Sequence, residues 1–254
     1  MQRIPLMGFA LVAYAIFFAT FLYLIAFVGD LALVPRTVDR GPVAPPGTTL
    51  LVNLSLVALF GLQHSAMARQ AFKHWWTRVV PPAAERSVYV LASSLALIIL
   101  FWGWRPLPAT VWDVHNTAGA ALLWAVFAAG WGIVILSTFL INHFELFGLQ
   151  QAWFALRNRA AAAPRLRQPF LYKVVRHPLY SGFLLAFWAT PHMTAGHLLL
   201  ASGLSVWMLL AIHAEEKDLV AVFGHDYEQY RARVGMLAPG LGRRAPQSPP
   251  APAE

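Results

Sequence analysis

The sequence predicts an all-α, polytopic membrane protein of about six transmembrane helices with a cytoplasmic C-terminal amphipathic helix. Hydrophobic residues make up 58% of the 254 residues and charged residues only 12%, which is too apolar for a soluble domain of this length. Several apolar stretches are long enough to cross a hydrocarbon core about 30 Å thick. The basic residues lie in loops between these stretches, a pattern typical of membrane proteins.

The spans follow from the apolar stretches and from the breaks between them. The loop over residues 30–47 is rich in proline and glycine, which cannot continue a helix. Pro191 and Gly196 separate the last two apolar stretches, which therefore form a hairpin. The expected spans are Pro5–Val28, Thr48–Ala68, Ser87–Trp104, Asn116–Ile141, Pro178–Pro191 and Ala195–His213. The alternative is five spans, with the short stretch from Pro178 as a re-entrant segment.

Two further helices are expected at the membrane surface. Lys73 and Arg78 flank Trp75 and Trp76 after the second span, a composition that favours a helix in the membrane interface. After the last span, one glutamate and several apolar and aromatic residues recur at three- and four-residue spacing, which predicts that a helix continues past the membrane. These residues are Glu216, Leu219, Val220, Phe223, Tyr227 and Tyr230. We expect one membrane domain over residues 1–239 and a disordered, proline-rich tail over residues 240–254.

Loop charges predict the orientation of the chain. The loops after the second and fourth spans are strongly basic, whereas the charges of the loops after the first and third spans balance. Because cytoplasmic loops carry an excess of Lys and Arg, we expect Lys73, Arg157 and the C-terminus in the cytoplasm. Asp39 and Asp113 are then expected outside.

Composition also argues against several classes of partner. The formal charge of +8 would suit a nucleic-acid-binding protein, but the loop pattern explains it, so no nucleic acid is expected. The absence of cysteine excludes disulfides, thiolate metal sites and a cysteine nucleophile. The nine histidines raise the possibility of a bis-histidine haem, yet no predicted span carries histidine at mid-membrane depth. We expect no metal ion. The expected partners are membrane lipid and a small-molecule ligand.

Two polar runs lie at the two feet of the predicted hairpin. The run RHPLYSG (residues 176–182) opens the fifth span, and Glu215 and Glu216 close the sixth. Pro178 suits the first turn of a helix, whose free N–H groups favour an anion, and Arg176 can bind a carboxylate through two parallel bonds. A hairpin brings these groups to the same membrane face as the two carboxylates. The sequence therefore predicts a pocket for a polar, zwitterionic ligand.

These runs also carry a family resemblance. Together with FGHDYEQYRARV (residues 223–234), they resemble the C-terminal half of the isoprenylcysteine carboxyl methyltransferase superfamily of membrane enzymes. The stretches LQHSAMAR, PPAAERSVYV and STFLINHFELFGLQQ resemble the bacterial methanethiol S-methyltransferases, which make dimethyl sulfide. The resemblance covers about residues 62–239, and in the superfamily the half that corresponds to residues 172–239 binds S-adenosylmethionine.

The resemblance implies methyl transfer from S-adenosylmethionine to a small thiol. The expected acceptor is methanethiol, with hydrogen sulfide as an additional candidate. It implies an integral protein of the bacterial inner membrane whose active site faces the cytoplasm. The cofactor-binding residues that it implies are Arg176, His177, Pro178, Tyr180, Gly182, Glu215, Glu216, Tyr227, Tyr230 and Arg233. Two alternatives stay open: a methyltransferase for a lipid or an isoprenylated substrate, and a non-enzymatic assembly factor or channel.

A thiol acceptor must also lose its proton. Even the cysteine thiol titrates at about 8.5, so a simple thiol is mostly protonated at neutral pH. Either a side chain removes the proton, or the sulfonium charge lowers the thiol pKa. The candidate bases are His64, His143, Glu145 and Tyr89. We prefer His143, because Asn142 and Glu145 beside it are placed to fix its tautomer.

Overall fold

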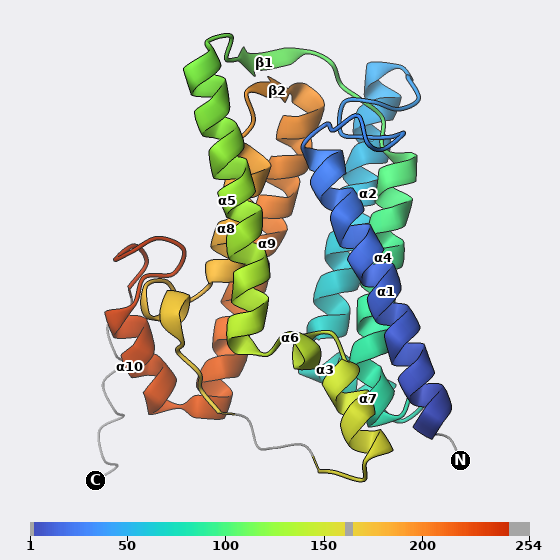
Figure 1. Ribbon diagram of the computed structural model, residues 1–254, viewed down its shortest axis with the longest axis vertical. Helices are drawn as coiled ribbons and strands as arrows, with labels where there is room; N and C mark the ends of the chain where they lie inside the picture. The colour runs from blue at the N-terminus through green and yellow to red at the C-terminus, as the bar shows by residue number, and fades with distance from the viewer. Residues whose placement is uncertain (1–2, 161–164, 244–254) are drawn as a thin grey trace, which may run out of the picture.

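The computed structural model describes residues 3–160 and 165–243, and this part of the chain is almost entirely helical (Figure 1). In chain order the elements are α1 Arg3–Val28, α2 Pro46–Ala68, α3 Gln70–Trp76, α4 Pro82–Gly103, β1 Thr110–Asp113, α5 Thr117–Ile141, α6 His143–Leu146, α7 Leu149–Leu156, the 3-10 helix η1 Phe170–Lys173, α8 Pro178–Trp188, β2 His192–Thr194, α9 Ala195–Phe223 and α10 His225–Arg233. The predicted all-α membrane fold is confirmed. Most of the predicted tail, from residue 244 on, lies outside the described residues.

Five helices are long and apolar enough to cross a membrane: α1, α2, α4, α5 and α9. The predicted fifth span is the 11-residue helix α8, whose length of about 16 Å is half of a hydrocarbon core. The strand β2 that follows α8 pairs antiparallel with β1. The helix α8 therefore leads to the end of the molecule where α4 ends and α5 begins, although it is too short to span alone.

The sequence-based prediction is wrong about the helix that follows the last span. A single helix was expected to continue through Tyr230, but α9 ends at Phe223 and α10 begins at His225. Gly224 between them has a φ of +53°, a conformation that L residues with a side chain rarely adopt. The three- and four-residue spacing of buried residues continues beyond Gly224. It does so because α10 packs against the rest of the fold and buries Tyr227 and Tyr230. The basic loop predicted after the fourth span also contains α6, α7 and η1.

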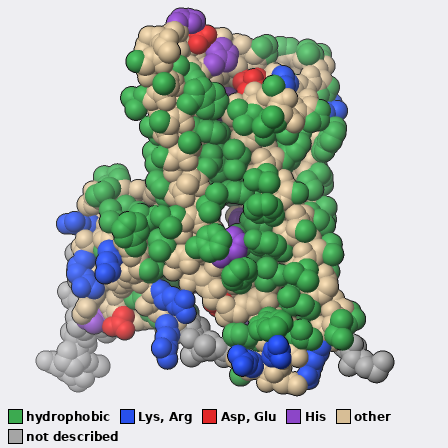
Figure 2. Space-filling model, in the orientation of Figure 1, with side chains coloured by type: hydrophobic (Ala, Val, Ile, Leu, Met, Phe, Trp, Pro, Cys, Tyr) green, Lys and Arg blue, Asp and Glu red, His purple; other side chains and the backbone are tan. Residues whose placement is uncertain are grey.

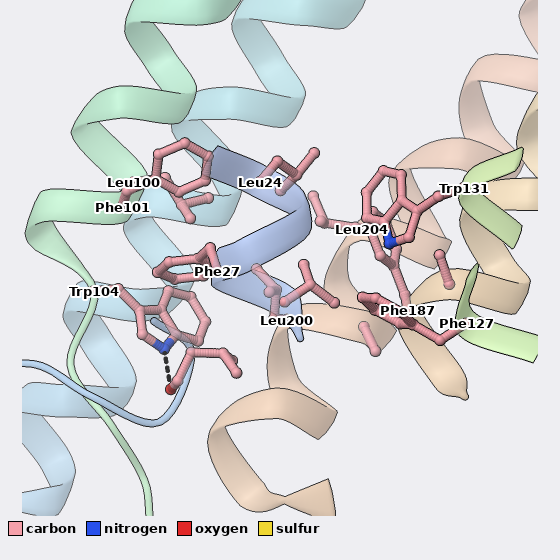
Figure 3. Packing of buried hydrophobic residues seen from close by; sticks show 14 of the residues in the cluster. Leu24, Phe27, Leu100, Phe101, Trp104, Phe127, Trp131, Phe187, Leu200 and Leu204 are labelled. Atoms are coloured by element: carbon pink, nitrogen blue, oxygen red, sulfur yellow. Dashed lines mark hydrogen bonds between the residues drawn. The ribbon is translucent and has the colours of Figure 1, made fainter. Parts of the chain in front are cut away.

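The helices pack in two groups. The N-terminal lobe consists of α1, α2, α4 and α7, and the C-terminal lobe of α5, α8, α9 and α10. One apolar cluster joins the lobes in the half of the molecule near the two strands (Figure 3). In it, the Phe27 ring of α1 lies 4.9 Å from the Phe101 ring of α4, and Leu200 and Leu204 of α9 face them from the other lobe. The Trp104 indole donates to the Val38 carbonyl at 3.0 Å, which closes the cluster.

Charged side chains are segregated to the two ends of the molecule. Lys and Arg gather at the lower end in Figure 2, where α3, α7 and α10 lie. Lys73 and Arg157 belong to this end, since they lie on α3 and at the C-terminus of α7. Asp113 and Asp39 lie at the opposite end, where Asp113 is part of β1 and Asp39 accepts a 2.5 Å hydrogen bond from Thr194 of β2. Lys73 and Arg157 thus lie at the opposite end of the molecule from Asp39 and Asp113, as predicted. Which of these ends faces the cytoplasm stays a prediction.

The helices α5 and α8 pack closely against each other through two glycines. A β-carbon on Gly130 would lie 2.7 Å from both the Gly182 carbonyl oxygen and the Ala186 nitrogen. A β-carbon on Gly182 would in turn lie 2.7 Å from the Gly130 carbonyl oxygen. Small residues at such crossings let helix backbones pack directly in a membrane.

We therefore expect Gly130→Ala to force the two backbones apart and to destabilise the protein by about 1–3 kcal/mol. Gly132 is the matched control, because a β-carbon there meets nothing within 4 Å. Thermal unfolding of the detergent-solubilised variants measures the effect. Equal unfolding midpoints for Gly130→Ala and Gly132→Ala would show that the close contact does not limit stability.

Candidate active site

The RHPLYSG run is fixed in place by a segment of the chain that follows α10. Pro178 occupies the first position of α8, where a missing N–H group costs nothing. The backbone N–H groups of Arg176 and His177 donate to the carbonyls of Gly235 and Met236 at 2.8 and 3.1 Å. The side chains that open α8 are therefore positioned by residues far away in the sequence.

The Arg176 guanidinium is buried and fully engaged, with only 3% of the residue exposed. Its Nε and Nη2 both lie 2.8 Å from Glu216 Oε1. Its Nη1 donates to the carbonyls of Arg231 and Val234 at 3.2 and 2.5 Å, and Nη2 also donates to the Gly242 carbonyl at 3.2 Å. A guanidinium has five N–H donors, and here each of them has an acceptor within the protein.

The sequence-based interpretation gave these donors to the carboxylate of a ligand. In the structure they hold Glu216 and the segment after α10 instead. Arg176 therefore organises the site, and a direct contact between Arg176 and a ligand stays a prediction.

Glu216 is the buried member of the carboxylate pair, with 2% of the residue exposed. Besides Arg176, its Oε1 lies 3.2 Å from His177 Nε2, and its Oε2 lies 4.0 Å from Arg231 Nη1. Burying a carboxylate is costly unless cations and hydrogen bonds compensate its charge. Three basic side chains surround this one, so Glu216 serves to hold α8, α9 and α10 together.

Glu215 is the open member of the pair. Its side chain is 46% exposed, and it accepts a hydrogen bond from the Tyr180 hydroxyl at 3.2 Å. His177 Nδ1 lies 4.0 Å from the same carboxylate. Because neighbouring residues on a helix point in different directions, Glu216 faces the interior of the cluster and leaves Glu215 available to a ligand.

The N-terminal lobe presents a second set of polar groups to this cluster. Tyr89 and Arg86 of α4 both lie within electrostatic range of Tyr180, as does Glu215. The Tyr89 hydroxyl lies 2.9 Å from His64 Nε2 of α2. Figure 2 shows that the surface is hollowed between the lower parts of the two lobes. The predicted residues Tyr89 and His64 thus form a pair that belongs to the same site as Tyr180 and Glu215.

Both ring nitrogens of His143 are engaged by other side chains of the protein. Its Nε2 lies 2.7 Å from the Tyr14 hydroxyl of α1, and its Nδ1 lies 2.8 Å from Thr138 Oγ1. The ring also stacks on Phe139, with 4.2 Å between centroids. Burial lowers the pKa of His143, so the ring is held as a neutral hydrogen-bonding group.

The reason for preferring His143 as the base is wrong. Asn142 donates to Glu145 Oε2 at 2.9 Å and to Gln150 Oε1 at 2.5 Å, and neither Asn142 nor Glu145 hydrogen-bonds the imidazole. Tyr14 and Thr138 fix the ring instead. The sequence did not reveal these partners, since one of them lies on the first helix.

The two predicted tyrosines of α10 differ in their contacts. The Tyr230 hydroxyl donates to the Tyr172 carbonyl at 2.5 Å and so fastens η1 to α10. The Tyr227 hydroxyl is buried and has no hydrogen-bond partner among the described residues. It lies within electrostatic range of Glu216, Arg176 and Glu215. Tyr227 is therefore the tyrosine with a polar group left for a ligand.

Two other predicted residues are not brought into the cluster. Arg233 is exposed, and its Nε donates to the Gln229 carbonyl of its own helix at 3.4 Å. Gly182 packs against Gly130 of α5, which explains why no side chain fits there. Their roles in cofactor binding stay predictions without a contact to support them.

A cavity of about 330 Å³ adjoins the site on the side of the N-terminal lobe. Its lining residues are Lys73, Glu85, Arg86, Ile141, Asn142, Glu145, Leu146 and Gln151. The predicted residue Glu145 belongs to this cavity, whereas Arg86 and Lys73 were missed as site residues. Arg86 precedes Tyr89 by three residues and so shares a helical face with it, which is the signal that would have found it. Among the described residues, no group of three His, Asp or Glu side chains is placed to hold a metal ion.

We expect the two carboxylates to respond differently to neutralisation. Glu216→Gln leaves Arg176 and Arg231 buried without a counter-charge and should destabilise the fold by about 3–5 kcal/mol. Glu215→Gln removes a half-exposed charge and should leave stability close to that of the wild type. Thermal unfolding of both variants in detergent checks this contrast. A Glu216→Gln protein as stable as the Glu215→Gln protein would contradict the structural role of the Arg176 pair.

The chain is similar to known proteins over most of its length. A family model described as NnrU protein matches residues 52–241. A methanethiol S-methyltransferase of Mycobacterium tuberculosis is 51% identical over 239 residues, which are 94% of this chain and 98% of the relative. Methanethiol S-methyltransferase 1 of Bradyrhizobium diazoefficiens is 51% identical over 91% of this chain and 81% of the relative. The enzyme of that name from Pseudomonas deceptionensis is 51% identical over 85% of this chain and 82% of the relative.

No solved structure matches the chain. The relatives nevertheless cover most of its length, and they confirm the resemblance drawn from the RHPLYSG and NHFELFG stretches. The chain therefore belongs to the NnrU protein family and to the same family as the bacterial methanethiol S-methyltransferases.

Proposed function

We propose that this membrane protein transfers the methyl group of S-adenosylmethionine to methanethiol and releases dimethyl sulfide. The observation that carries the proposal is the 51% identity, over 94% of the chain, to a protein named for this reaction. The site supports it, because the half-exposed Glu215 carboxylate lies within electrostatic range of the buried Tyr89, which is hydrogen-bonded to the partly buried His64. The excess of Lys and Arg at this end of the molecule supports a site that faces the cytoplasm of a bacterial inner membrane.

The residues at the site fit S-adenosylmethionine, which would supply an activated methyl group on a sulfonium. Glu215 is an open carboxylate held by Tyr180, and a carboxylate of this kind favours a cationic group beside it. The buried Tyr227 hydroxyl lacks a partner and fits a polar group of the cofactor. Burial raises the pKa of Tyr227, so this hydroxyl remains a neutral hydrogen-bond donor.

The Tyr89–His64 pair is the proposed proton acceptor for the thiol. As the thiol sulfur forms its bond to the methyl carbon, the bond from that carbon to the sulfonium sulfur breaks and the thiol proton must leave. His64 can take the proton on a ring nitrogen, directly or through the Tyr89 hydroxyl at 2.9 Å. Tyr89 lies within electrostatic range of Glu215, which ties the pair to the cofactor side of the site.

Bulky side chains favour a small acceptor. The Phe183 and Phe187 rings of α8 lie 5.7 and 6.1 Å from the Trp131 ring of α5, so aromatic packing fills the space between these helices. A long isoprenyl or acyl chain therefore finds no room between these two helices, whereas a thiol with a single carbon needs none.

The reaction is tested with purified protein in detergent, S-adenosylmethionine and methanethiol. We expect dimethyl sulfide in the headspace and S-adenosylhomocysteine in solution in equal amounts, because each turnover produces one of each. Omitting either reactant is the control. Protein that binds S-adenosylmethionine but yields no dimethyl sulfide would refute the acceptor, and protein that binds none would refute the proposal as a whole.

Single variants then separate the two histidines. His64→Ala should reduce turnover by about 10²–10⁴-fold, the usual contribution of general acid–base catalysis, while cofactor affinity stays near that of the wild type. Tyr89→Phe should also slow turnover, because it removes the hydroxyl that is hydrogen-bonded to His64. His143→Ala is the matched control, and its turnover should remain close to wild type in the fraction that folds. A loss of turnover confined to His143→Ala would reverse this assignment.

A further inference from the structure

Because Arg176 is bonded within the protein, another cation must bind the carboxylate of a zwitterionic ligand. All five guanidinium donors of Arg176 have acceptors within the protein. An amino-acid ligand beside Glu215 places its positive groups near that carboxylate, and its own carboxylate then requires another basic partner. That partner must lie within reach of the Tyr180 and Glu215 side of the site.

Arg86 meets this requirement from the facing lobe. Its Nε donates to the Leu146 carbonyl at 2.7 Å, which fixes the direction of the side chain. Its guanidinium carbon lies 5.2 Å from the centroid of the Tyr89 ring. Within the described chain, no hydrogen bond or ion pair engages its two terminal nitrogens. A positioned guanidinium with its fork left open is suited to bind a carboxylate through two parallel bonds.

The cavity next to Arg86 combines both signs of charge. Lys73 and Arg86 supply cations, and Glu85 and Glu145 supply carboxylates, yet no ion pair joins these four side chains in the described structure. Gln151 lines the same cavity, and its buried Oε1 has no hydrogen-bond partner there. Such a lining complements a ligand that carries an ammonium and a carboxylate together.

The charge of Lys73 is consistent with this arrangement. Burial and the neighbouring Arg86 lower the pKa of Lys73, although Glu85 and Asp218 oppose the shift. Two cations held close together in a partly buried place destabilise each other, and an anion between them would relieve the repulsion. The cavity is therefore prepared for a negative group on its basic side.

We propose that this cavity binds the amino-acid end of S-adenosylmethionine, with Arg86 holding the carboxylate and Lys73 reinforcing it. The inference rests on the proposed function and adds the residues that recognise the cofactor from the N-terminal lobe. The volume of about 330 Å³ lies at the lower limit of small-molecule pockets and suits one end of a ligand. The sulfonium then lies toward Tyr89 and Glu215, where the methyl group is needed.

Binding titrations with two forms of the cofactor test the proposal. Purified full-length protein in detergent is titrated with S-adenosylmethionine and with its decarboxylated form, which lacks only the carboxylate. We expect the wild type to prefer the complete cofactor by about tenfold or more, the usual effect of a charge-assisted hydrogen bond. Arg86→Gln should lose this preference and bind both forms as weakly as the wild type binds the decarboxylated form.

Two further variants keep the test decisive. Lys73→Gln should reduce the preference severalfold without changing affinity for the decarboxylated form, and it leaves the bond between Arg86 and Leu146 intact. Arg78→Gln is the matched control, since Arg78 is exposed and does not line the cavity, and its preference should equal that of the wild type. Unfolding midpoints establish that each variant is folded.

Each outcome is distinguishable. A wild type that binds both forms equally, or Arg86→Gln and Lys73→Gln proteins that keep the full preference, would overturn the inference and leave the proposed function standing. A wild type that binds neither form would refute the proposed function itself.

Discussion

The buried pair of Arg176 and Glu216 is the interaction on which the C-terminal lobe depends. Removing two charges from water costs several kcal/mol per ion, and the cost is met only where geometry is good and the remaining donors are satisfied. Here Glu216 Oε1 receives both Nε and Nη2 of Arg176, and backbone carbonyls take the other donors. One side chain thus connects the start of α8, the inner part of α9 and the segment beyond α10.

The distribution of apolar and polar contacts explains why the site lies between the lobes. The aromatic and aliphatic cluster around Phe27, Phe101 and Leu200 joins the lobes near the strands and holds that half closed. Toward the other end the facing residues become polar: Tyr180 and Glu215 on one side, Arg86 and Tyr89 on the other. Electrostatic interactions between such groups are strong where water is scarce, which suits a reaction that moves a positive charge.

Sequence reasoning succeeded where the signal is local. The five long helices follow from apolar stretches bounded by proline, glycine and charge, and the short α8 follows from Pro178 and Pro191. The hairpin formed by α8 and α9 was predicted to bring the RHPLYSG run and the two glutamates to the same membrane face, and Arg176 and Glu216 are in contact there.

It failed where partners are distant or lack a side-chain signature. Three of the acceptors of Arg176 are backbone carbonyls, which any residue provides, so the sequence could not show that its donors are engaged. Tyr14 reaches His143 from the first helix, and nothing in the spacing of either residue indicates this. Gly224 interrupts a helix whose hydrophobic periodicity continues past it.

The bond between Arg176 and the Gly242 carbonyl ties the site to the last described residues of the chain. A truncation before Gly242 would take away one acceptor of a buried guanidinium, although it would leave every long apolar helix intact. The segment after α10 is therefore part of the site's framework, even though its described residues form no helix of their own.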